Sequence, residues 1–270
     1  MEYKDLLYEK EGHVATVTFN RPDRLNALSQ DMMESTALVC EEINSDEDVR
    51  VAVVTGAGRA FCAGLDLKET SLASGNTRWL EIKPQYTEVN KIFDCDKPTI
   101  AAINGVAVGG GFVMALECDI RIASDRASMS TIYSKIGMPA VDAIGDLLPR
   151  AVGLSKALEM LYTSDMMDAE ECARIGLVSR VVAHDDLMDE VYKLADKIAS
   201  RPPVAIRLTK NVVMAPVRQS YAETMPLHSF ASAMNHKVAN HDVEEGMRAF
   251  HEKRDPTFKG LLKEEGSQES

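Results

Sequence analysis

The sequence has few cysteines, and they are not arranged as a framework. Five are scattered along 270 residues with no CxxC pair: Cys40, Cys62, Cys95, Cys118 and Cys172. Such an odd, unclustered set argues against a disulfide scaffold or a zinc site and favours a reducing compartment. The first residues also contain no apolar signal segment. We therefore expect a cytoplasmic protein.

Positive charge is also scarce. There are 30 Lys and Arg residues against 42 Asp and Glu, which gives a formal net charge of −12. No run of Lys or Arg provides the basic stripe that a nucleic-acid binder needs to release counterions. The same net charge would repel an anionic membrane surface, and an anionic ligand would need local basic residues to overcome it. We expect neither nucleic acid nor a membrane as a partner.

Histidine is missing from much of the chain. The six histidines leave residues 14–183 without one: His13, His184, His228, His236, His241 and His251. This gap covers the glycine-rich segments and argues against a Ser-His-Asp triad there. No HxxxH pair or carboxylate–histidine cluster appears either, so the sequence predicts no catalytic metal.

One segment, Thr99–Leu116, is almost uncharged and nearly as long as a membrane span. It contains Asn104 and the run Gly109–Gly111. These residues suit a turn better than the middle of a lipid-spanning helix. The segment therefore predicts a buried strand, a glycine turn and a helix.

Apolar segments alternate with helical patterns in the first 150 residues. The expected strands, rich in β-branched residues, are residues 14–19, 51–55, 99–103 and 120–123. Ser29 precedes a helical pattern and is a candidate N-cap. Strands that are apolar on both faces and alternate with helices predict an α/β fold whose sheet is covered by helices.

The character of the chain changes after about residue 150. The expected helices, rich in Met, Ala and Leu, are residues 151–164, 169–175, 185–200 and 203–250. Arg201-Pro202-Pro203 breaks the pattern before the last of them. We expect an α/β core at residues 1–190 and a helical C-terminal part at residues 191–270, with a frayed tail.

Two glycine-rich segments suggest how the chain binds a carbonyl oxygen. Gly109–Gly111 precedes a helix, where glycine lets backbone approach a ligand and the helix start offers unpaired N–H groups. Leu65, after Gly64, supplies a second amide. The amides of Leu65 and Gly110 aimed at one oxygen would form an oxyanion hole, which stabilises negative charge that develops on a carbonyl oxygen. The plainer interpretation of the triple glycine is tight strand–helix packing.

A dinucleotide site is the main alternative for the glycines. Gly56-Ala57-Gly58 follows a strand but lacks the third glycine of GxGxxG, and the later run has the wrong spacing. No GK[ST] loop exists in the chain. The sequence therefore gives the dinucleotide alternative little support.

Three segments in this order resemble the crotonase (enoyl-CoA hydratase/isomerase) superfamily. They are residues 20–28 (NRPDRLNAL), 58–67 (GRAFCAGLDL) and 97–124 (KPTIAAINGVAVGGGFVMALECDIRIAS). Further matches extend the resemblance to nearly the whole chain, at residues 148–153, 173–178 and 245–254. The resemblance implies a spiral α/β core of ββα units and a helical part that packs subunits into a trimer or a dimer of trimers. It also implies an acyl-CoA substrate of fatty acid metabolism, with coenzyme A as part of the thioester and no permanently bound cofactor.

The resemblance also implies contacts to coenzyme A. The backbone at Ala63 and Leu67 would hold the adenine and the pantetheine. Lys253 would meet the phosphates, and Arg24 would border the nucleotide; the alternative for both is a solvated surface charge. Asp66 lies in the same segment and either joins this site or orients its own loop.

The chain departs from the superfamily where a hydratase carries its two glutamates. The resemblance places Val113 at the first position and Tyr133 at the second. Valine cannot transfer a proton, and a tyrosine with a pKa near 10 is a poor base at neutral pH. Tyr133 would instead donate a hydrogen bond or pack against the acyl group. Glu117, one turn beyond Val113, could share its face or pair with Arg121.

Asp142 is the candidate replacement for these groups. Isomerases, hydrolases and dehalogenases of the superfamily use an aspartate in the loop that residues 137–146 match, and Asp142 lies within one residue of that position. Asp146 is expected to start a helix. Three functions follow: an enoyl-CoA hydratase/isomerase, an Asp142-dependent acyl-CoA isomerase or hydrolase, and a catalytically silent acyl-CoA-binding protein.

Overall fold

The computed structural model describes residues 3–66, 92, 95–137, 140, 143–214 and 221–260. Two of the site residues expected from the sequence, Leu67 and Asp142, lie outside the described residues. The C-terminal tail, which the sequence predicts to be frayed, lies outside them as well.

The centre of the fold is a six-stranded sheet in the order β1-β2-β3-β5-β7-β10. Its strands are β1 (Leu6–Glu11), β2 (Val14–Phe19), β3 (Val51–Gly56), β5 (Thr99–Ile103), β7 (Ile120–Ser124) and β10 (Arg180–Val182). The first two form an antiparallel hairpin, and every other neighbouring pair is parallel. The four strands expected from the sequence are all present in this sheet.

A smaller sheet has the order β4-β6-β8-β9. Its strands are β4 (Ala60–Cys62), β6 (Val106–Val108), β8 (Ser128–Ser130) and β9 (Met167–Asp168). The chain alternates between the sheets, because β4 follows β3, β6 follows β5, and β8 follows β7. This repeated pairing of a long and a short strand confirms the expected crotonase-like α/β core.

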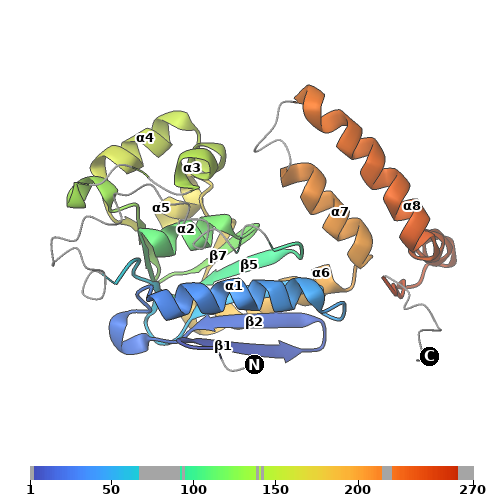
Figure 1. The fold of residues 1–270 in the computed structure, drawn as a ribbon, viewed down its shortest axis with the longest axis horizontal. Coiled ribbons are helices and arrows are strands. Elements are labelled where there is room, and N and C mark those ends of the chain that lie inside the picture. The colour runs from blue at the N-terminus through green and yellow to red at the C-terminus, as the bar shows by residue number, and fades with distance from the viewer. Residues whose placement is uncertain are drawn as a thin grey trace.

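The large sheet buries both of its faces. Along β3, Val51 and Val53 point to one face and Val54 to the other, as the two-residue period of a strand requires. Helix α6 (Leu187–Ala199) packs on the first face through buried residues that include Val191. Helix α1 (Gln30–Ser45) packs on the second, and Figure 1 shows it running along the sheet.

Shorter helices connect the two sheets. They are η1 (Pro22–Arg24), α2 (Gly110–Glu117), η5 (Tyr133–Ile136), α3 (Ile144–Val152), α4 (Leu154–Thr163), α5 (Ala169–Arg174) and η6 (His184–Asp186). The helix expected at residues 151–164 begins later, because Gly153 has a φ of 80° and separates α3 from α4. Ser29 is confirmed as the N-cap of α1, since its Oγ accepts a hydrogen bond from Met32 N at 3.0 Å. Asp146 is confirmed in the first turn of α3.

The helical C-terminal part contains α7 (Pro203–Met214) and α8 (Tyr221–Glu252). These helices lie side by side and extend away from the sheets (Figure 1). Helix α8 is kinked at Ala239, whose backbone leaves the helical region at φ −140° and ψ 30°. None of the described residues of α7 is fully buried. No helix in the described part of the chain is long and apolar enough to span a membrane.

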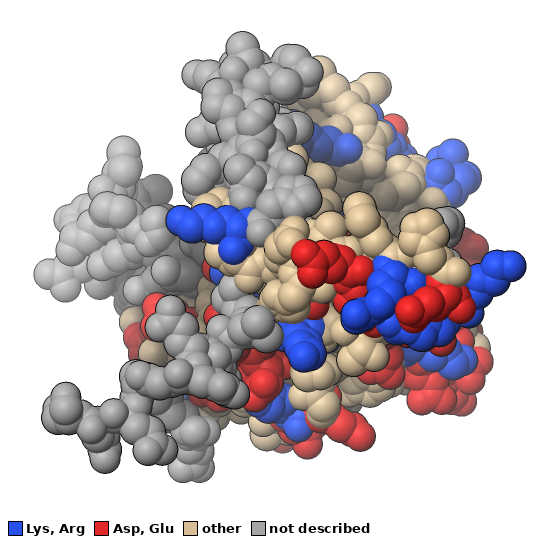
Figure 2. Space-filling view, turned by 90° about the vertical axis from the view of Figure 1, so that its right-hand side faces the viewer, with Lys and Arg blue, Asp and Glu red and all other residues tan. Residues whose placement is uncertain are grey.

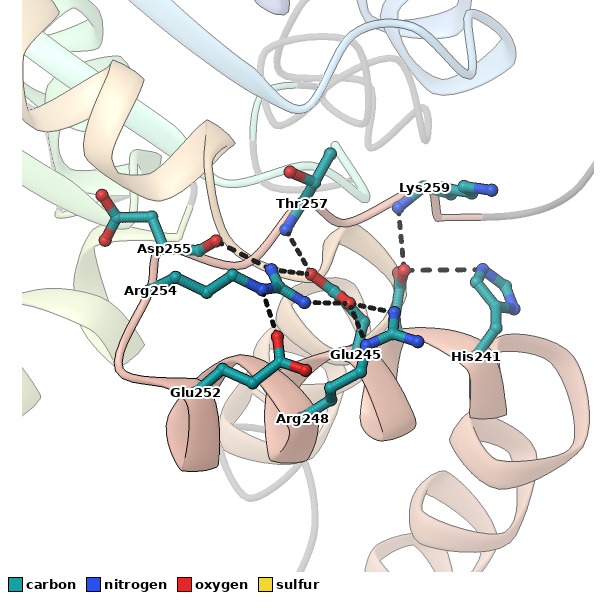
Figure 3. Close-up of polar contacts among 9 residues, drawn as sticks. His241, Glu245, Arg248, Glu252, Arg254, Asp255, Thr257 and Lys259 are labelled. Atoms are coloured by element: carbon teal, nitrogen blue, oxygen red, sulfur yellow. Dashed lines mark hydrogen bonds and ion pairs between the residues drawn. The ribbon is translucent and has the colours of Figure 1, made fainter.

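The chain after α8 folds back on the helix through two carboxylates (Figure 3). Glu245 accepts hydrogen bonds from the Arg254 guanidinium at 2.6 Å and from Thr257 N at 3.0 Å. Asp242, which is 2% exposed, accepts from Lys259 N at 2.8 Å and from Gly260 N at 2.9 Å. The two carboxylates therefore fix the backbone of residues 254–260.

Charges of both signs are mixed on the face of the molecule that Figure 2 shows. Figure 2 faces the end of the molecule that carries α7 and α8, and it shows basic side chains interspersed with acidic ones. Neighbouring opposite charges cancel at long range, so only a local cluster on this side could attract an anion.

Candidate active site

Two backbone amides, of Leu65 and Gly110, lie at the carboxyl ends of the short strands β4 and β6. Leu28 N donates to Gly64 O at 2.8 Å, and Asp66 N donates to Leu28 O at 3.0 Å. This parallel bridge uses the groups on either side of Leu65 and turns the N–H of Leu65 the other way. Gly110 is the first residue of α2, where no intrahelical acceptor exists. Among the described residues, neither N–H donates a hydrogen bond.

The loops that carry these amides touch each other. Gly64 has a φ of +84°, and a Cβ on it would lie 2.6 Å from Val108 O and 3.3 Å from Gly110 N. A Cβ on Gly111 would lie 2.1 Å from Cys62 O. Tight packing therefore accounts for Gly111. A Cβ on Gly110 would instead meet the flexible end of the Leu28 side chain, so Gly110 does not have the same packing constraint.

Two buried asparagines hold the backbone on which the Leu65 loop rests. Asn26 Nδ2 donates to Ala57 O at 2.9 Å and Ala60 O at 2.8 Å. Asn104 Nδ2 donates to Gly56 O at 2.9 Å, to Gly58 O at 3.0 Å and to Ala60 O at 3.2 Å. Sequence reasoning did not assign this function to either residue, although each follows a strand or turn inside a motif segment.

Asp66 is positioned by an arginine from another motif segment. It is 6% exposed, and its Oδ2 lies 3.2 Å from Arg21 Nη1, which also donates to Ala27 O at 2.7 Å. Arg21 is also close to Asp5, with 3.3 Å between Nε and Oδ2. These contacts orient the loop that follows Leu65, as the second interpretation of Asp66 expects. A contact between Asp66 and coenzyme A stays a prediction.

The structure brings Arg24 next to Ala63 but not next to Lys253. Ala63 N donates to Leu25 O at 3.0 Å, so the turn that holds the exposed Arg24 adjoins the β4 loop. Lys253 is exposed and follows the end of α8, and Figure 1 shows α8 beyond α7, at the other end of the molecule from α2. Within one chain, Lys253 is therefore far from the two amides.

Val113 and Tyr133, at the positions of the hydratase glutamates, are both buried in the same apolar cluster. Val113 is 0% exposed and Tyr133 is 5% exposed. The residue before Tyr133, Ile132, has an unfavourable φ of 63°, and its side chain lies against Gly109. The tyrosine turn therefore adjoins the glycine turn that begins α2.

Hydroxyl groups fix the tyrosine turn to the end of α4. Ser164 is 0% exposed with a φ of 49°, and its Oγ accepts from Ser134 Oγ at 2.8 Å and from Ser134 N at 3.2 Å. Ser130 Oγ donates to Ser164 O at 2.9 Å, and Thr131 Oγ1 donates to Met160 O at 2.9 Å. No local sequence pattern indicates this cluster, since its members are distant along the chain.

The expected pairing of Glu117 with Arg121 is wrong. Arg121 instead donates to three carbonyls, from Nε to Leu177 O at 2.7 Å and from Nη1 to Cys118 O at 2.7 Å and Leu116 O at 3.2 Å. Arg121 therefore satisfies carbonyls at the end of α2, which would otherwise lack partners. Glu117 itself is 2% exposed.

The only thiol beside the Leu65 loop is not a nucleophile in the described structure. Burial raises the pKa of Cys62 to about 12, so its sulfur stays protonated at neutral pH. All five cysteines are buried, and none of them forms a disulfide. In the ranges that the structure describes, no group of three His, Cys, Asp or Glu side chains could hold a metal ion.

Two sheets built from paired long and short strands, with two glycine loops meeting at the start of a helix, define an α/β protein of the crotonase class. The chain belongs to the enoyl-CoA hydratase/isomerase family, whose sequence model matches residues 9–261. It is therefore a member of an enzyme family of the hydratase/isomerase type.

Curated relatives and solved structures agree with this assignment. The chain is 36% identical over 261 residues to a short-chain-enoyl-CoA hydratase of Clostridium acetobutylicum, covering 94% of this chain and 97% of that protein. It is 37% identical over 261 residues to an (E)-benzylidenesuccinyl-CoA hydratase of Thauera aromatica, covering 93% and 98%. The crystal structure of an enoyl-CoA hydratase from Bacillus anthracis matches with a TM-score of 0.89 at 32% identity, covering 95% of this chain and 100% of that one.

Proposed function

We propose that this enzyme binds an acyl-CoA thioester and stabilises its enolate between the amides of Leu65 and Gly110. The observation that carries the proposal is the contact between the Gly64 loop and the start of α2, with two N–H groups that have no acceptor among the described residues. Each such donor contributes about 2.7–4 kcal/mol to the transition state in enzymes that use one. The dipole of α2 adds to the stabilisation, because Gly110 is at its positive end.

The proton transfer that follows needs a side chain other than the hydratase glutamates. Val113 has no ionisable group, and Tyr133 is buried in an apolar cluster. We infer that Asp142 acts as the acid/base or nucleophile in an isomerisation or hydrolysis. Ala63 and Leu67 would hold coenzyme A by their backbones, and Arg24 would border the nucleotide.

A second candidate is an acyl-CoA-binding protein without turnover. The side chains at the two glutamate positions favour it, because neither Val113 nor the buried Tyr133 can serve as a base at neutral pH. The two functions share the oxyanion hole and differ only in the presence of a base.

Exchange of the α-hydrogens of butyryl-CoA in D2O tests the proposal, since exchange needs both the oxyanion hole and a base. We expect exchange with the wild type, and a rate lower by a factor of about 10²–10⁴ for Asp142→Asn. The matched control is Asp146→Asn, which changes an acid in the first turn of α3 and should leave exchange intact. Tight binding of butyryl-CoA without exchange would instead support the silent binding protein.

Hydration of crotonyl-CoA tests the consequence of the missing glutamates. We expect hydration far below the turnover of about 10 per second that is typical of enzymes. A turnover near that value would contradict the inference that Val113 and Tyr133 change the reaction.

We also propose that the chain forms a trimer or a dimer of trimers in the cytoplasm. Val213 on α7 and Met247 on α8 are 63% and 64% exposed, so each of the two helices presents an apolar side chain that a neighbouring subunit could cover. A neighbouring subunit could then receive Lys253 at its coenzyme A phosphates, which one chain alone does not achieve. Sedimentation equilibrium tests this assembly.

A further inference from the structure

A small cavity lies between the core and the C-terminal part, and the proposed function does not use it. Its volume is about 170 Å³, and it is lined from the core by Lys97 and Arg50 and from the C-terminal part by Pro203, Arg207 and Gly260. Lys97 precedes β5 and Arg50 precedes β3, so the cavity is at the amino ends of these parallel strands. The Leu65 and Gly110 loops follow the carboxyl ends of strands, at the other edge.

The cavity and the candidate acyl-CoA site are separated by the length of the strands, because they lie at opposite strand ends. Strand β5 has five residues and spans about 16 Å at roughly 3.3 Å per residue. The turn of Gly109–Gly111 comes after that strand and after β6. The cavity is therefore a second place at which a ligand could bind.

Lys97 is the unusual member of this cavity. Its side chain is only 4% exposed, and in the described part of the chain its Nζ makes no hydrogen bond or ion pair. Burial lowers the pKa of this ammonium, because the charged form loses its water. Glu47 and Asp96 act on this ammonium only through space, so it still has the capacity to bind an anion directly, as a buried charge normally does.

The other basic groups around the cavity are held in place but only weakly neutralised. Arg50 donates to two carbonyls, Ala199 O at 3.0 Å and Phe258 O at 3.2 Å. Arg207 Nη1 lies 3.8 Å from Glu47 Oε1, which is longer than a hydrogen bond. Lys259 completes a set of four basic residues against the two acidic residues Glu47 and Asp48. This local excess of positive charge occurs in a chain of net charge −12.

The backbone that supplies Lys259 and Gly260 is itself fixed. Asp242 accepts from both of their N–H groups, so the C-terminal wall of the cavity is fixed without a ligand. On the core side, Lys97 O accepts from Lys210 Nζ at 2.9 Å, and that ammonium also pairs with Asp119 at 2.9 Å. Contacts within the protein therefore fix both walls of the cavity, without the help of a bound anion.

We propose that this cavity binds a small inorganic oxyanion of the phosphate class, with Lys97 as its buried ligand and Arg50 and Arg207 as further donors. The volume suits such an ion and excludes a nucleotide or coenzyme A, since pockets for larger ligands measure roughly 300–1,000 Å³. The bound anion would bridge the core and the C-terminal part, because each contributes basic residues. Arginine and lysine are the usual ligands of phosphate oxygens.

Scanning calorimetry of the full chain in inorganic phosphate or chloride at equal ionic strength tests this proposal. A ligand that binds only the folded state raises the Tm as its concentration increases. We expect a phosphate-dependent rise for the wild type and for the control Lys193→Gln, whose exposed ammonium pairs with Glu190 on α6. We expect no rise for Lys97→Met and a smaller rise for Arg207→Gln.

The outcomes separate this site from other sources of phosphate binding. If Lys97→Met does not fold, Arg207→Gln decides, and a response equal to that of the wild type would contradict the proposal. No phosphate response in the wild type would also contradict it. A response that disappears when coenzyme A is saturating would assign the phosphate to the acyl-CoA site instead, whereas an unchanged response supports a separate site.

Discussion

The candidate active site has two halves, one formed by backbone groups and the other by side chains. One half is backbone: the amides of Leu65 and Gly110, supported by Asn26 and Asn104. The other half is side chain: Val113 and Tyr133, buried where the resemblance implies glutamates. The backbone half keeps the features of the family motifs, and the side-chain half does not.

This difference shows which part of the chemistry each half controls. An oxyanion hole depends on where two N–H groups point, so many sequences can provide it if the loops keep their shape. Proton transfer depends on one side chain of suitable pKa, so a single substitution removes it. We therefore expect enolate stabilisation to be retained and the type of reaction to have changed.

Separating the two loops of the backbone half should have the largest effect. In Gly64→Ala the new Cβ would lie 2.6 Å from Val108 O at a φ of +84°, so the loops must move apart. We expect the α-hydrogen exchange rate to fall by a factor of about 10²–10³. In the control Gly145→Ala, nothing lies within 4 Å of the new Cβ, and the rate should not change. Equal rates for the two variants would show that the Gly64 loop is not part of the oxyanion hole.

Restoring the side-chain half should produce the next largest effect. We expect the double variant Val113→Glu/Tyr133→Glu to hydrate crotonyl-CoA at least about tenfold faster than the wild type. The gain should stay below the rate factor of about 10²–10⁴ that native acid–base groups contribute, because both positions are buried and a new carboxylate there is costly. Circular dichroism should first establish that the variant folds. Hydration that stays at the wild-type level in a folded variant would mean that more than these glutamates is missing.

The support beneath the backbone half should affect stability more than rate. Asn104→Ala leaves the carbonyls of Gly56, Gly58 and Ala60 with fewer donors. We expect the free energy of unfolding to fall by about 1–3 kcal/mol in urea titrations. The control Asn240→Ala, on the exposed face of α8, should cost less than about 0.5 kcal/mol. A similar loss in both variants would argue against a special function for Asn104.

The smallest expected effect is that of the buried Cys62 thiol on the free energy of unfolding at alkaline pH. Burial raises the pKa of Cys62 from 9.0 to about 12. Between these values the unfolded state binds fewer protons than the native state, so the free energy of unfolding falls as pH rises above about 9. The slope is at most about 1.4 kcal/mol per pH unit for this thiol. Urea titrations between about pH 8 and pH 10 should show a shallower decline for Cys62→Ala, and identical slopes would contradict the assignment.

Sequence reasoning predicts the long elements of this fold well and its short ones poorly. The strands at residues 14–19 and 99–103 are buried on both faces and stand out as apolar runs. Strand β1 is mostly exposed and polar, and the strands of the small sheet have two or three residues, too few to show a period. These elements are defined by pairing with distant neighbours rather than by their own sequences.

The same contrast applies to the candidate site. Glycine runs indicate where the backbone approaches a ligand, so the contact of the Gly64 and Gly110 loops follows from local motifs. The hydroxyl cluster of Ser164 with Ser134 joins residues 30 positions apart and depends on packing of α4 that no local pattern encodes. The incorrect pairing of Glu117 with Arg121 has a similar cause, because helical spacing cannot show that α2 ends before Arg121.

Difference infrared spectroscopy of the thioester carbonyl of bound butyryl-CoA tests the central claim most directly, because it needs no base and no turnover. Two amide donors weaken the C=O bond, so we predict a lower stretching frequency in the wild type than in solution, and a value closer to solution in Gly64→Ala. A carbonyl that is bound at saturation but keeps its solution frequency in the wild type would contradict an oxyanion hole at Leu65 and Gly110.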